Sequence, residues 1–515
     1  MDATEFNFLA SLPAIAPEIG LTIMALVVLA LDVGFMGIIP ALPESKKKNI
    51  AYVTAIALGL LALTPLIWRP LTPDDAGFVE NMLYWGGMVR HDTLSQIFKV
   101  MILAGAAITA LMSVDVKEVG QKGEFYLIII ISTLGACLLS AASDLIMVFL
   151  ALETLSIPLY ILAAFKRDDA RSAESGMKYF LFGSFASALM LYGLSLLYGF
   201  SGQTNLYGIA EFLSVGTMAD MPIAVLGALV LVVVGFGFKI SAAPFHFWTP
   251  DVYEGAPTPV TAYLSVASKA ASFALLMRFF IAVFPITLVV GNQVIQDFWV
   301  NLMVVLAVVS MTLGNLLALP QRNIKRLLAY SSIAQAGYTL IGVAAIQSQE
   351  ASGVAAVGFY MFMYTFTNLL AFAVVILFSE STGSETIADL AGLNRRSPWL
   401  ALALTIALLS LAGIPPAAGF FGKFFLFNAA VEADLTWLAI VGVLNSIVAL
   451  YYYLVVIKVM YVDRSEDEDK PIPMSNAYVW VLGVTALAVI FLGTFGAQVI
   501  FDWAVEGARS LFPVL

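Results

Sequence analysis

The chain has 515 residues, of which 61% are hydrophobic and only 12% charged, and its formal net charge is −10 at pH 7. A soluble protein of this length needs about a quarter of its residues charged to cover its surface, so the composition excludes a soluble globular protein. The acidic balance also argues against a nucleic-acid partner, because no basic face is available to bind phosphates.

Apolar runs long enough to cross a hydrocarbon core about 30 Å thick recur along the whole chain. They predict an all-α polytopic membrane protein with about 14 transmembrane helices. The first run follows Asp2 and Glu5 rather than a basic segment, so we expect it to be retained and not cleaved as a signal peptide. The predicted spans are 15–39, 49–68, 95–113, 125–142, 144–165, 173–200, 222–247, 257–284, 298–318, 324–346, 354–379, 398–430, 435–461 and 476–508.

Lysine and arginine alternate between the connecting loops of these spans. Fifteen lie in the odd-numbered loops, and only Arg69, Arg90 and Arg509 lie in the even-numbered loops and the termini. Because positive loops stay on the inner side, both termini are predicted to lie outside. No loop is long enough for a soluble domain. The largest, 69–94, is predicted to form a short hairpin on the outer side.

Seven basic residues remain inside the predicted spans, where a charge costs on the order of 3 kcal/mol or more unless it faces protein or water. For Lys99 and Lys458, each about one turn from a helix end, we expect the side chain to snorkel to an interface. Arg278 and Lys178 could snorkel or point inward. The remaining three are Lys239, Lys269 and Lys423.

These three lysines are expected to face the interior of the bundle. Lys269 lies near the middle of its span, and small residues flank it, as in a closely packed helix face. Among the acids, Glu153 is the clearest mid-span carboxylate, with Asp32 as a second candidate nearer the inner end. A buried glutamate that meets a buried lysine couples the protonation states of both groups. A purely structural ion pair is the alternative.

The stretch GFGFKISAAPFHFW places a lysine, a proline and a histidine at the end of one span. Pro244 removes a backbone donor and clashes with the carbonyl four residues back, so we expect a break around residues 240–244. A broken helix at membrane depth persists only where it is buried in protein or lines an aqueous cavity. Lys239, the break and His246 together predict a proton site with access toward the inner face.

A second interrupted helix occurs in SLAGIPPAAGFFGKFFLFNAA, where Pro415 and Pro416 precede Lys423. Paired interrupted helices predict two inverted repeats with sites near the midplane. The predicted division is 1–124 for the flanking helices 1–3, 125–284 for the first five-helix repeat, 298–461 for the second, and 476–515 for helix 14.

The chain resembles the antiporter-like membrane subunits of complex I and of Mrp-type cation/proton antiporters. The resemblance covers nearly the whole chain and includes Glu153 on the fifth span, Lys269 on the eighth, and the lysines of both broken helices. The stretch from Lys239 to Lys269, KISAAPFHFWTPDVYEGAPTPVTAYLSVASK, is most similar to subunit 2 (subunit N) of the cyanobacterial and chloroplast NAD(P)H–plastoquinone oxidoreductase.

The resemblance implies a proton-translocating subunit in the membrane arm of an NAD(P)H- or ferredoxin-quinone oxidoreductase. Quinone, NAD(P)H or ferredoxin, and iron–sulfur clusters would belong to other subunits. The implied partners are the other membrane-arm subunits, together with lipids. The implied location is a thylakoid membrane, with both termini on the lumenal side.

The resemblance also implies roles for the first group of buried charges. Glu153 would control the protonation of Lys239, and Lys178, near Glu153, would take part in coupling. A unit charge about 4 Å away is worth roughly 4 kcal/mol at an effective dielectric near 20, which is enough to load or empty a lysine.

For the second group, the resemblance implies a path across the membrane. Lys269, helped by His246, would connect Lys239 to the inner aqueous side. Lys423 would pass the proton toward the outer side or relay charge to the next subunit.

The sequence predicts no cofactor- or metal-binding residue. Cys137, the single cysteine, lies in an apolar run without a neighbouring thiol, and we expect it to be a small buried hydrophobe. The sequence contains no Gly-rich nucleotide loop and no pair of histidines placed to hold a haem. Electrons are therefore expected to move through other subunits.

Two other functions remain open at this stage. A subunit of an Mrp-type sodium/proton antiporter would use the same buried ions. A passive membrane scaffold would use them only to specify packing.

Overall fold

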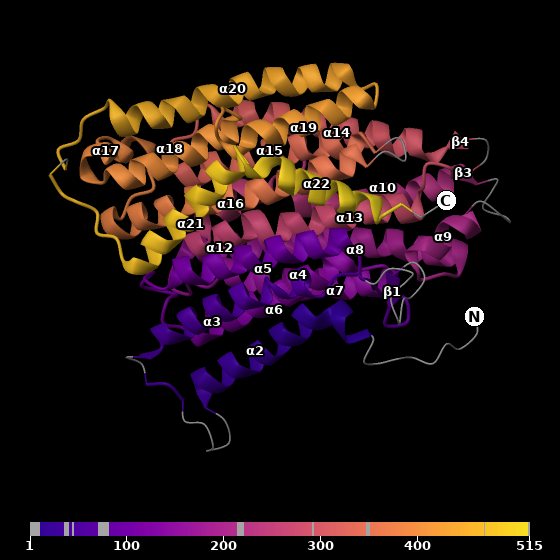
Figure 1. Ribbon diagram of the computed structural model, residues 1–515, viewed down its shortest axis with the longest axis horizontal. Coiled ribbons are helices and arrows are strands. Elements are labelled where there is room, and N and C mark those ends of the chain that lie inside the picture. Colours follow the sequence, from indigo (N-terminus) through magenta and orange to yellow (C-terminus); the bar gives the residue numbers. More distant parts are fainter. Residues whose placement is uncertain are drawn as a thin grey trace.

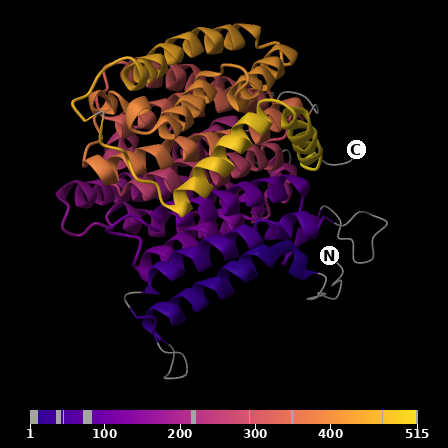
Figure 2. The same cartoon turned by 60° about the vertical axis from the view of Figure 1, so that its left-hand side comes forward.

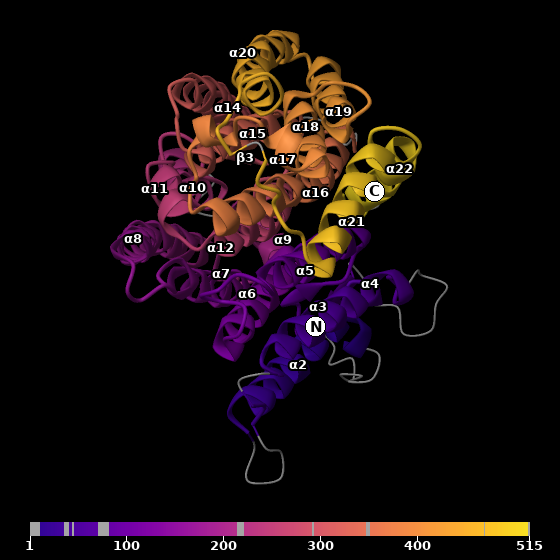
Figure 3. The ribbon, with the colours of Figure 1, turned by 90° about the vertical axis from the view of Figure 1, so that its left-hand side faces the viewer.

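The computed structural model describes residues 11–34, 41–43, 46–70, 82–213, 221–290, 293–346, 351–467 and 469–512. Long helices run side by side in one elongated bundle (Figure 1). Helix α2 (Ala16–Val33) and helix α20 (Thr436–Tyr461) lie at opposite edges of the bundle, as Figure 2 also shows. The end-on view in Figure 3 shows α16 (Ser352–Thr382) between these two edges.

The flanking N-terminal part contains a short hairpin beside long helices. Strand β1 (Leu83–Tyr84) pairs antiparallel with β2 (Val89–Arg90), which confirms the hairpin predicted within 69–94. The helical elements of this part are η1 (Leu12–Ile15), α2, α3 (Lys48–Leu61), α4 (Thr64–Ile67) and α5 (Thr93–Ser113).

The middle of the chain folds into two successive groups of helices. The first comprises α6 (Gly123–Ala141), α7 (Leu145–Ala163), α8 (Ala170–Ser201), α9 (Leu206–Leu213), α10 (Pro222–Ile240), α11 (Trp248–Gly255), α12 (Thr258–Tyr263), the π-helical turn η5 (Leu264–Ser268) and α13 (Lys269–Val283). The hairpin β3 (Val289–Val290) and β4 (Gln293–Val294) connects it to the second group. The second comprises α14 (Ile295–Ala318), α15 (Ile324–Ala344), α16, η6 (Ile387–Leu390), α17 (Leu393–Arg396), α18 (Pro398–Ala412), α19 (Ala418–Glu432) and α20.

Local polar residues set the start of several helices. In each case a side-chain oxygen accepts a hydrogen bond from a backbone N–H of the first turn, which satisfies one of the donors that a helix leaves unpaired. These capping residues are Asp92 for α5, Asp144 for α7, Asp169 for α8 and Asn323 for α15.

Both predicted helix breaks are present. Helix α10 ends at Ile240, Ser241 adopts φ 62°, and α11 begins only at Trp248. Helix α18 ends at Ala412, Gly413 adopts φ 88°, and α19 begins at Ala418. The predicted spans 222–247 and 398–430 are therefore each interrupted at their prolines.

The C-terminal helices form a bent pair that returns to the flanking helices. Helix α21 (Asn476–Leu492) and helix α22 (Gly496–Arg509) meet at 79°, and both pack against α5. The bend differs from the single straight span expected for 476–508.

In the described residues, 12 helices are long and apolar enough to cross a membrane, and the bent pair raises this to 13. The remaining predicted span, 398–430, is divided between the short apolar helix α18 and helix α19. The all-α polytopic fold is confirmed, and about 14 helices is consistent with this count. The division into two inverted repeats stays a prediction.

The centre of the bundle is formed by α12 with α13, by α15 and by α16, which are almost wholly buried. The two hairpins lie at one end of the bundle and α17 at the other (Figure 1). We call the α17 end, which carries the odd-numbered loops, the inner end, and the hairpin end the outer end.

Candidate functional site

Three lysines lie buried inside the bundle, as predicted. Lys239, Lys269 and Lys423 are only 4%, 2% and 4% exposed. None of the three has a carboxylate oxygen within 4 Å in the part of the chain that the structure describes. Each ammonium group is instead held by neutral oxygen atoms.

Lys239 lies in the last turn of α10 and contacts α7. Its Nζ donates a hydrogen bond to Ser156 Oγ, and Ser156 in turn donates to the carbonyl of Leu152. The ring centroids of Tyr160 and Phe238 each lie 5.6 Å from Nζ. A hydroxyl and two ring faces therefore surround this charge.

Glu153 belongs to the same site but does not touch the lysine. It lies one helical turn before Ser156 on α7, and its buried Oε1 has no hydrogen-bond partner in the structure. Ser156, the residue that binds Lys239, therefore lies about one turn from Glu153 along the same helix. The predicted proximity of these two residues is present without an ion pair.

Lys178 lies elsewhere. Its Nζ pairs with Asp251 Oδ2 at 2.6 Å and Glu174 Oε1 at 2.7 Å, and its side chain is 36% exposed. It belongs to the inner end of α8, whereas Glu153 lies near the middle of α7. The structure therefore does not place Lys178 next to Glu153. Lys178 pairs instead with Asp251 and Glu174.

Asp251 connects the two helix groups at the inner end. Besides Lys178 of α8 it binds Arg326 of α15 at 2.8 Å, and Arg326 also binds Glu254 at 3.0 Å. Burial alone would raise the pKa of Asp251, but hydrogen bonds from Lys178 and Arg326 lower it below its ordinary value. This ion-pair group holds the short helix α11 between α8 and α15.

His246 lies in the break between α10 and α11. The side chain is buried, its ring stacks on Phe247 at 4.7 Å, and Nδ1 has no hydrogen-bond partner. No hydrogen bond among the described residues joins it to Lys239 or Lys269. Its predicted role beside Lys269 stays a prediction.

Lys269 begins α13 directly after the π-helical turn, a distortion that is frequent at functional sites. Its Nζ donates to the carbonyl of Ser332 at 2.8 Å and to Ser332 Oγ at 2.6 Å. The same hydroxyl accepts from Tyr364 at 2.9 Å and lies 3.2 Å from the hydroxyl of Tyr253. Ser332 is thus the centre of a cluster drawn from α11, α13, α15 and α16.

A second hydrogen-bonded group lies along α15 beside this cluster. Ser331 Oγ hydrogen-bonds the hydroxyl of Tyr453, which also accepts from Gln335 Nε2 at 3.3 Å. Gln335 Nε2 donates to the carbonyl of Leu411 at 3.0 Å, and Gln335 Oε1 accepts from Tyr360. This network reaches the broken end of α18 without leaving the protein interior.

Lys423 meets the network at that end. Its Nζ donates to the carbonyl of Ala412 at 3.0 Å and lies 4.4 Å from the ring centroid of Tyr338. A Cβ on Gly413 would stand 2.9 Å from Lys423 Cδ, and the backbone there has a positive φ. Glycine is therefore required for the lysine to approach this carbonyl.

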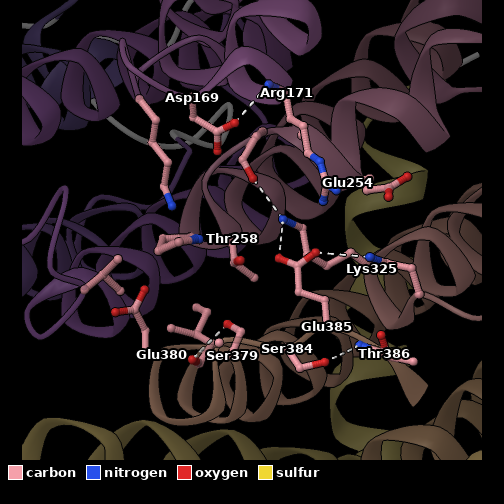
Figure 4. A pocket seen from close by; sticks show the side chains of 18 residues that line it. Asp169, Arg171, Glu254, Thr258, Lys325, Ser379, Glu380, Ser384, Glu385 and Thr386 are labelled. Carbon is pink, nitrogen blue, oxygen red and sulfur yellow. Dashed lines mark hydrogen bonds and ion pairs between the residues drawn. The ribbon is translucent and has the colours of Figure 1, made fainter. Parts of the chain in front are cut away.

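A polar cavity of about 400 Å³ lies at the inner end (Figure 4). In its wall Lys325 Nζ binds Glu385 at 2.9 Å and the carbonyl of Ala256 at 3.0 Å. Figure 4 shows Lys325 and Glu385 among the residues that line this cavity. Helices α8, α11, α15 and α16 all contribute residues to its wall. Other charged residues in the wall are Lys166, Asp169, Arg171, Glu254 and Glu380.

Tyr253 belongs to α11, which also contributes to the wall of this cavity. Its neighbour Glu254 lines the cavity, as does Thr258 at the start of α12. The side chain of Tyr253 is fully buried, and its hydroxyl reaches Ser332 Oγ at 3.2 Å. Helix α11 therefore contacts the serine that holds Lys269 and contributes Glu254 to the cavity wall.

The outer end holds a different kind of buried charge. Arg278, whose direction the sequence left open, is completely buried and binds Asp92 with two hydrogen bonds of 2.6 and 2.9 Å. Arg90 lies 3.2 Å from the same carboxylate. Burial alone would raise the pKa of Asp92, but the two guanidinium groups lower it to about 2.

The expected snorkelling of Lys99 is wrong. Lys99 is buried and pairs with Glu18 of α2 at 2.7 Å, because helix packing brings a carboxylate to it inside the bundle. Lys458, by contrast, is exposed and pairs with Asp463 at 2.8 Å, as expected for a residue at an interface. Asp32, the second candidate acid, pairs with Lys47 at 3.3 Å near the inner end.

Sequence reasoning missed the residues of α15 that surround Lys269 and Lys423. The most important are Ser332, Gln335 and Tyr338, which follow each other on α15 within SSIAQAGY. A polar residue at every third or fourth position of a buried span is the pattern that could have found them. Tyr253 stands directly before a cavity-lining residue but carries no comparable sequence pattern.

No three histidine, cysteine, aspartate or glutamate side chains gather as a possible metal site in the described ranges. Cys137 is buried, as expected. The chemistry of the site is therefore that of buried ammonium, hydroxyl and amide groups, which can hold and transfer protons.

Comparison with known proteins finds a matching family and relatives that cover most of the chain. Residues 142–449 match the family described as NADH:quinone oxidoreductase/Mrp antiporter, transmembrane. Subunit N of the NADH-quinone oxidoreductase of Moorella thermoacetica is 42% identical over 485 residues, covering 94% of this chain and 97% of that protein. Subunit 2 of the NAD(P)H-quinone oxidoreductase of Nostoc sp. is 46% identical over 415 residues, covering 80% and 77%.

A solved structure shares the fold. A chain of respiratory complex I from Thermus thermophilus superposes with a TM-score of 0.73 at 31% identity, covering 94% of this chain and 98% of that one.

Proposed function

We infer the function of this chain from one premise: it belongs to the family of membrane subunits that NADH:quinone oxidoreductases share with Mrp antiporters. It is an integral multi-pass membrane protein and the antiporter-like subunit N of a complex I-type enzyme. It carries protons across the membrane while quinone is reduced on other subunits. The observation that supports this function best is the set of three buried lysines, each held by neutral groups and by no carboxylate within 4 Å among the described residues.

Protons reach Lys269 and Lys423 from the inner end. The polar cavity of Figure 4 collects them, and Tyr253 connects its wall to the Ser332–Lys269 cluster. From there Gln335 and its phenol partners lead to the carbonyls at the end of α18, where Lys423 binds. Lys423 passes the proton toward the outer side or relays its charge to the next subunit.

Glu153 and Lys239 form a switch in the first group of helices. Ser156 binds Lys239, and Glu153 lies one turn away on the same helix. A small movement of α7 or of the glutamate side chain therefore changes how strongly the carboxylate stabilises the ammonium. Lys178 acts on this switch through Asp251 and α11, and His246 keeps the break accessible from the inner side.

The chain acts as a subunit of a translocase and carries no redox group of its own. NAD(P)H or ferredoxin, quinone and the iron–sulfur clusters are bound by partner subunits. The other membrane-arm subunits pack along the sides of this bundle. An Mrp-type sodium/proton antiporter subunit is the alternative, and co-purification with hydrophilic iron–sulfur subunits decides between them.

A finer assignment is a photosynthetic NAD(P)H–plastoquinone enzyme of a thylakoid membrane, with both termini in the lumen. The 46% identity to the Nostoc subunit supports it, although that match covers less of the chain than the match to the Moorella subunit. Purified complex supplied with NADH, NADPH or reduced ferredoxin tests it. Preference for NADH with ubiquinone or menaquinone would reject the photosynthetic assignment.

The function is tested by proton uptake into sealed vesicles that contain the intact complex, driven by its electron donor. The variants are Glu153→Gln and Lys239→Met, with Lys458→Met as a control because that lysine is exposed. We expect both site variants to assemble and to lose most proton uptake, while the control keeps it. Parental pumping by both assembled site variants would assign these charges to packing alone.

A further inference from the structure

Lys423 is stabilised by an unusual set of partners for a buried cation. One backbone carbonyl, from Ala412, binds Nζ at 3.0 Å, and the ring of Tyr338 lies 4.4 Å away. No carboxylate within 4 Å balances the charge in the described part of the chain. The negative face of an aromatic ring attracts a cation at this distance, and the attraction strengthens in a desolvated site.

The ring of Tyr338 is fixed in place from behind. Asn315 Nδ2 donates to the tyrosine hydroxyl at 3.2 Å and to the carbonyl of Asn445 at 3.1 Å. Asn315 Oδ1 accepts from Tyr452 at 3.0 Å. Both Asn315 and Tyr338 are completely buried, so a fully satisfied amide holds the phenol end and leaves the ring face to the lysine.

The first helix group has a related ring contact. Lys239, also on a broken helix, lies 5.6 Å from the ring centroids of both Tyr160 and Phe238. Tyr160 belongs to α7 and Tyr338 to α15, the second helix of each predicted repeat. The recurrence at two independent sites indicates that the ring contact belongs to the function of the broken-helix lysines.

We propose that an aromatic face is the resident group that stabilises the protonated form of these lysines, with Tyr338, positioned by Asn315, acting on Lys423. The proposal rests on the proton-transfer function of Lys423. A ring face holds a charge without competing for the proton, whereas a carboxylate would hold it as a fixed ion pair. Tyr160 acts on Lys239 in the same way but more weakly, because its ring is farther away and Glu153 is near.

The sharpest test replaces Tyr338 with phenylalanine and then with phenylalanines bearing one, two or three ring fluorines. Fluorine withdraws the negative charge of the ring face while the shape of the side chain hardly changes, so assembly is preserved. Proton uptake is measured in vesicles of the intact complex. The control series places the same residues at Phe359, which is buried and faces no described cation.

Tyr338→Phe is the reference of the series, because it keeps the ring but loses the hydroxyl that Asn315 binds. From this reference we expect uptake to fall with each fluorine, to about one tenth with three. The control series stays flat, and the same series at Tyr160 gives a shallower slope. Equal activity along the Tyr338 series would overturn the proposal. So would a Tyr338→Phe variant as impaired as the trifluorinated one, since the hydroxyl and not the ring would then be required.

The failure of this inference can be told from failure of the proposed function. Lys423→Met in the same vesicles removes the cation itself. If that variant pumps like the parent, the lysine has no part in proton transfer. If it is inactive while the fluorine series is flat, only the ring contact is rejected.

Discussion

Buried cations are held in opposite ways at the outer end and in the middle of this molecule. At the outer end, Arg278 is completely buried and binds Asp92 through two hydrogen bonds. In the middle, Lys239, Lys269 and Lys423 are almost as buried, yet their ammonium groups contact hydroxyls, carbonyls and ring faces. A guanidinium with its carboxylate is a permanent charge pair, whereas a lysine among neutral groups can change its protonation state.

The two halves of the middle also differ. In 125–284, buried polar atoms without a protein partner are frequent, and they include Glu153 Oε1, Tyr179 Oη and Thr249 Oγ1. In the described part of 298–461, Trp299 Nε1 is the one such side-chain atom. Buried polar groups without a partner are uncommon in folded proteins. The two halves thus differ in how completely their own side chains and backbone pair the buried polar groups.

The largest expected effect comes from breaking the permanent pair. Asp92→Ala leaves the buried charge of Arg278 without its carboxylate, which costs about 3–5 kcal/mol of folding free energy. Thermal unfolding and assembly of the complex measure it. Asp463→Ala removes the partner of the exposed Lys458 and is the matched control, with a loss below about 1 kcal/mol. Similar losses in both variants would show that burial does not separate the two kinds of pair.

Removing the hydrogen bonds of Gln335 in the second half is expected to have the next largest effect. Gln335→Leu removes the amide that joins Tyr453, Tyr360 and the carbonyl of Leu411. We expect proton uptake to fall at least about tenfold, with a destabilisation of about 1–3 kcal/mol from the groups left unpaired. The control Thr339→Val removes a hydroxyl that bonds only the backbone of its own helix. Full pumping by an assembled Gln335→Leu variant would show that protons do not use this chain of groups.

A third prediction concerns the inner cavity. Thr258→Cys places a thiol in the cavity wall, where a charged, membrane-impermeant thiol reagent added from the inner side should react and lower proton uptake several-fold. Asp168→Cys is the control, because it is exposed on the neighbouring inner loop and does not line the cavity. Cys137 is buried and should not react. Labelling of position 258 without loss of uptake would exclude the cavity from the path.

The smallest expected effect is at the half-exposed ion-pair group around Asp251. Its pKa is lowered in the folded protein, so its stabilising contribution is present above the ordinary aspartate pKa and is lost as the pH falls through the folded value. Asp251→Asn should therefore cost about 1 kcal/mol near pH 7 and less at acidic pH. Thermal unfolding at several pH values measures it. A difference from the parent that grows toward acidic pH would contradict the sign.

The sequence predicted the fold and the buried lysines because those depend on local chemistry. Hydropathy gave the spans, while the orientation read from lysine and arginine stays a prediction. The prolines predicted both breaks, because a proline has no backbone N–H and so removes a hydrogen bond from its own turn of the helix. Glu153 and Lys239 were correctly expected to be near each other, while the roles assigned to Lys178 and His246 remain predictions.

What the tertiary structure decided is which neighbours each charge meets. Lys99 was expected at an interface but pairs with Glu18, a residue 81 positions earlier in the chain. Lys423 lies over Tyr338, and Lys269 is held by Ser332 from another helix. Such contacts depend on the way in which the long helices are rotated and packed against one another, and no local sequence pattern encodes this packing. The sequence by itself therefore determined that this protein places lysines inside a membrane, and the packing of its helices decided that neutral hydroxyls, carbonyls and rings hold them.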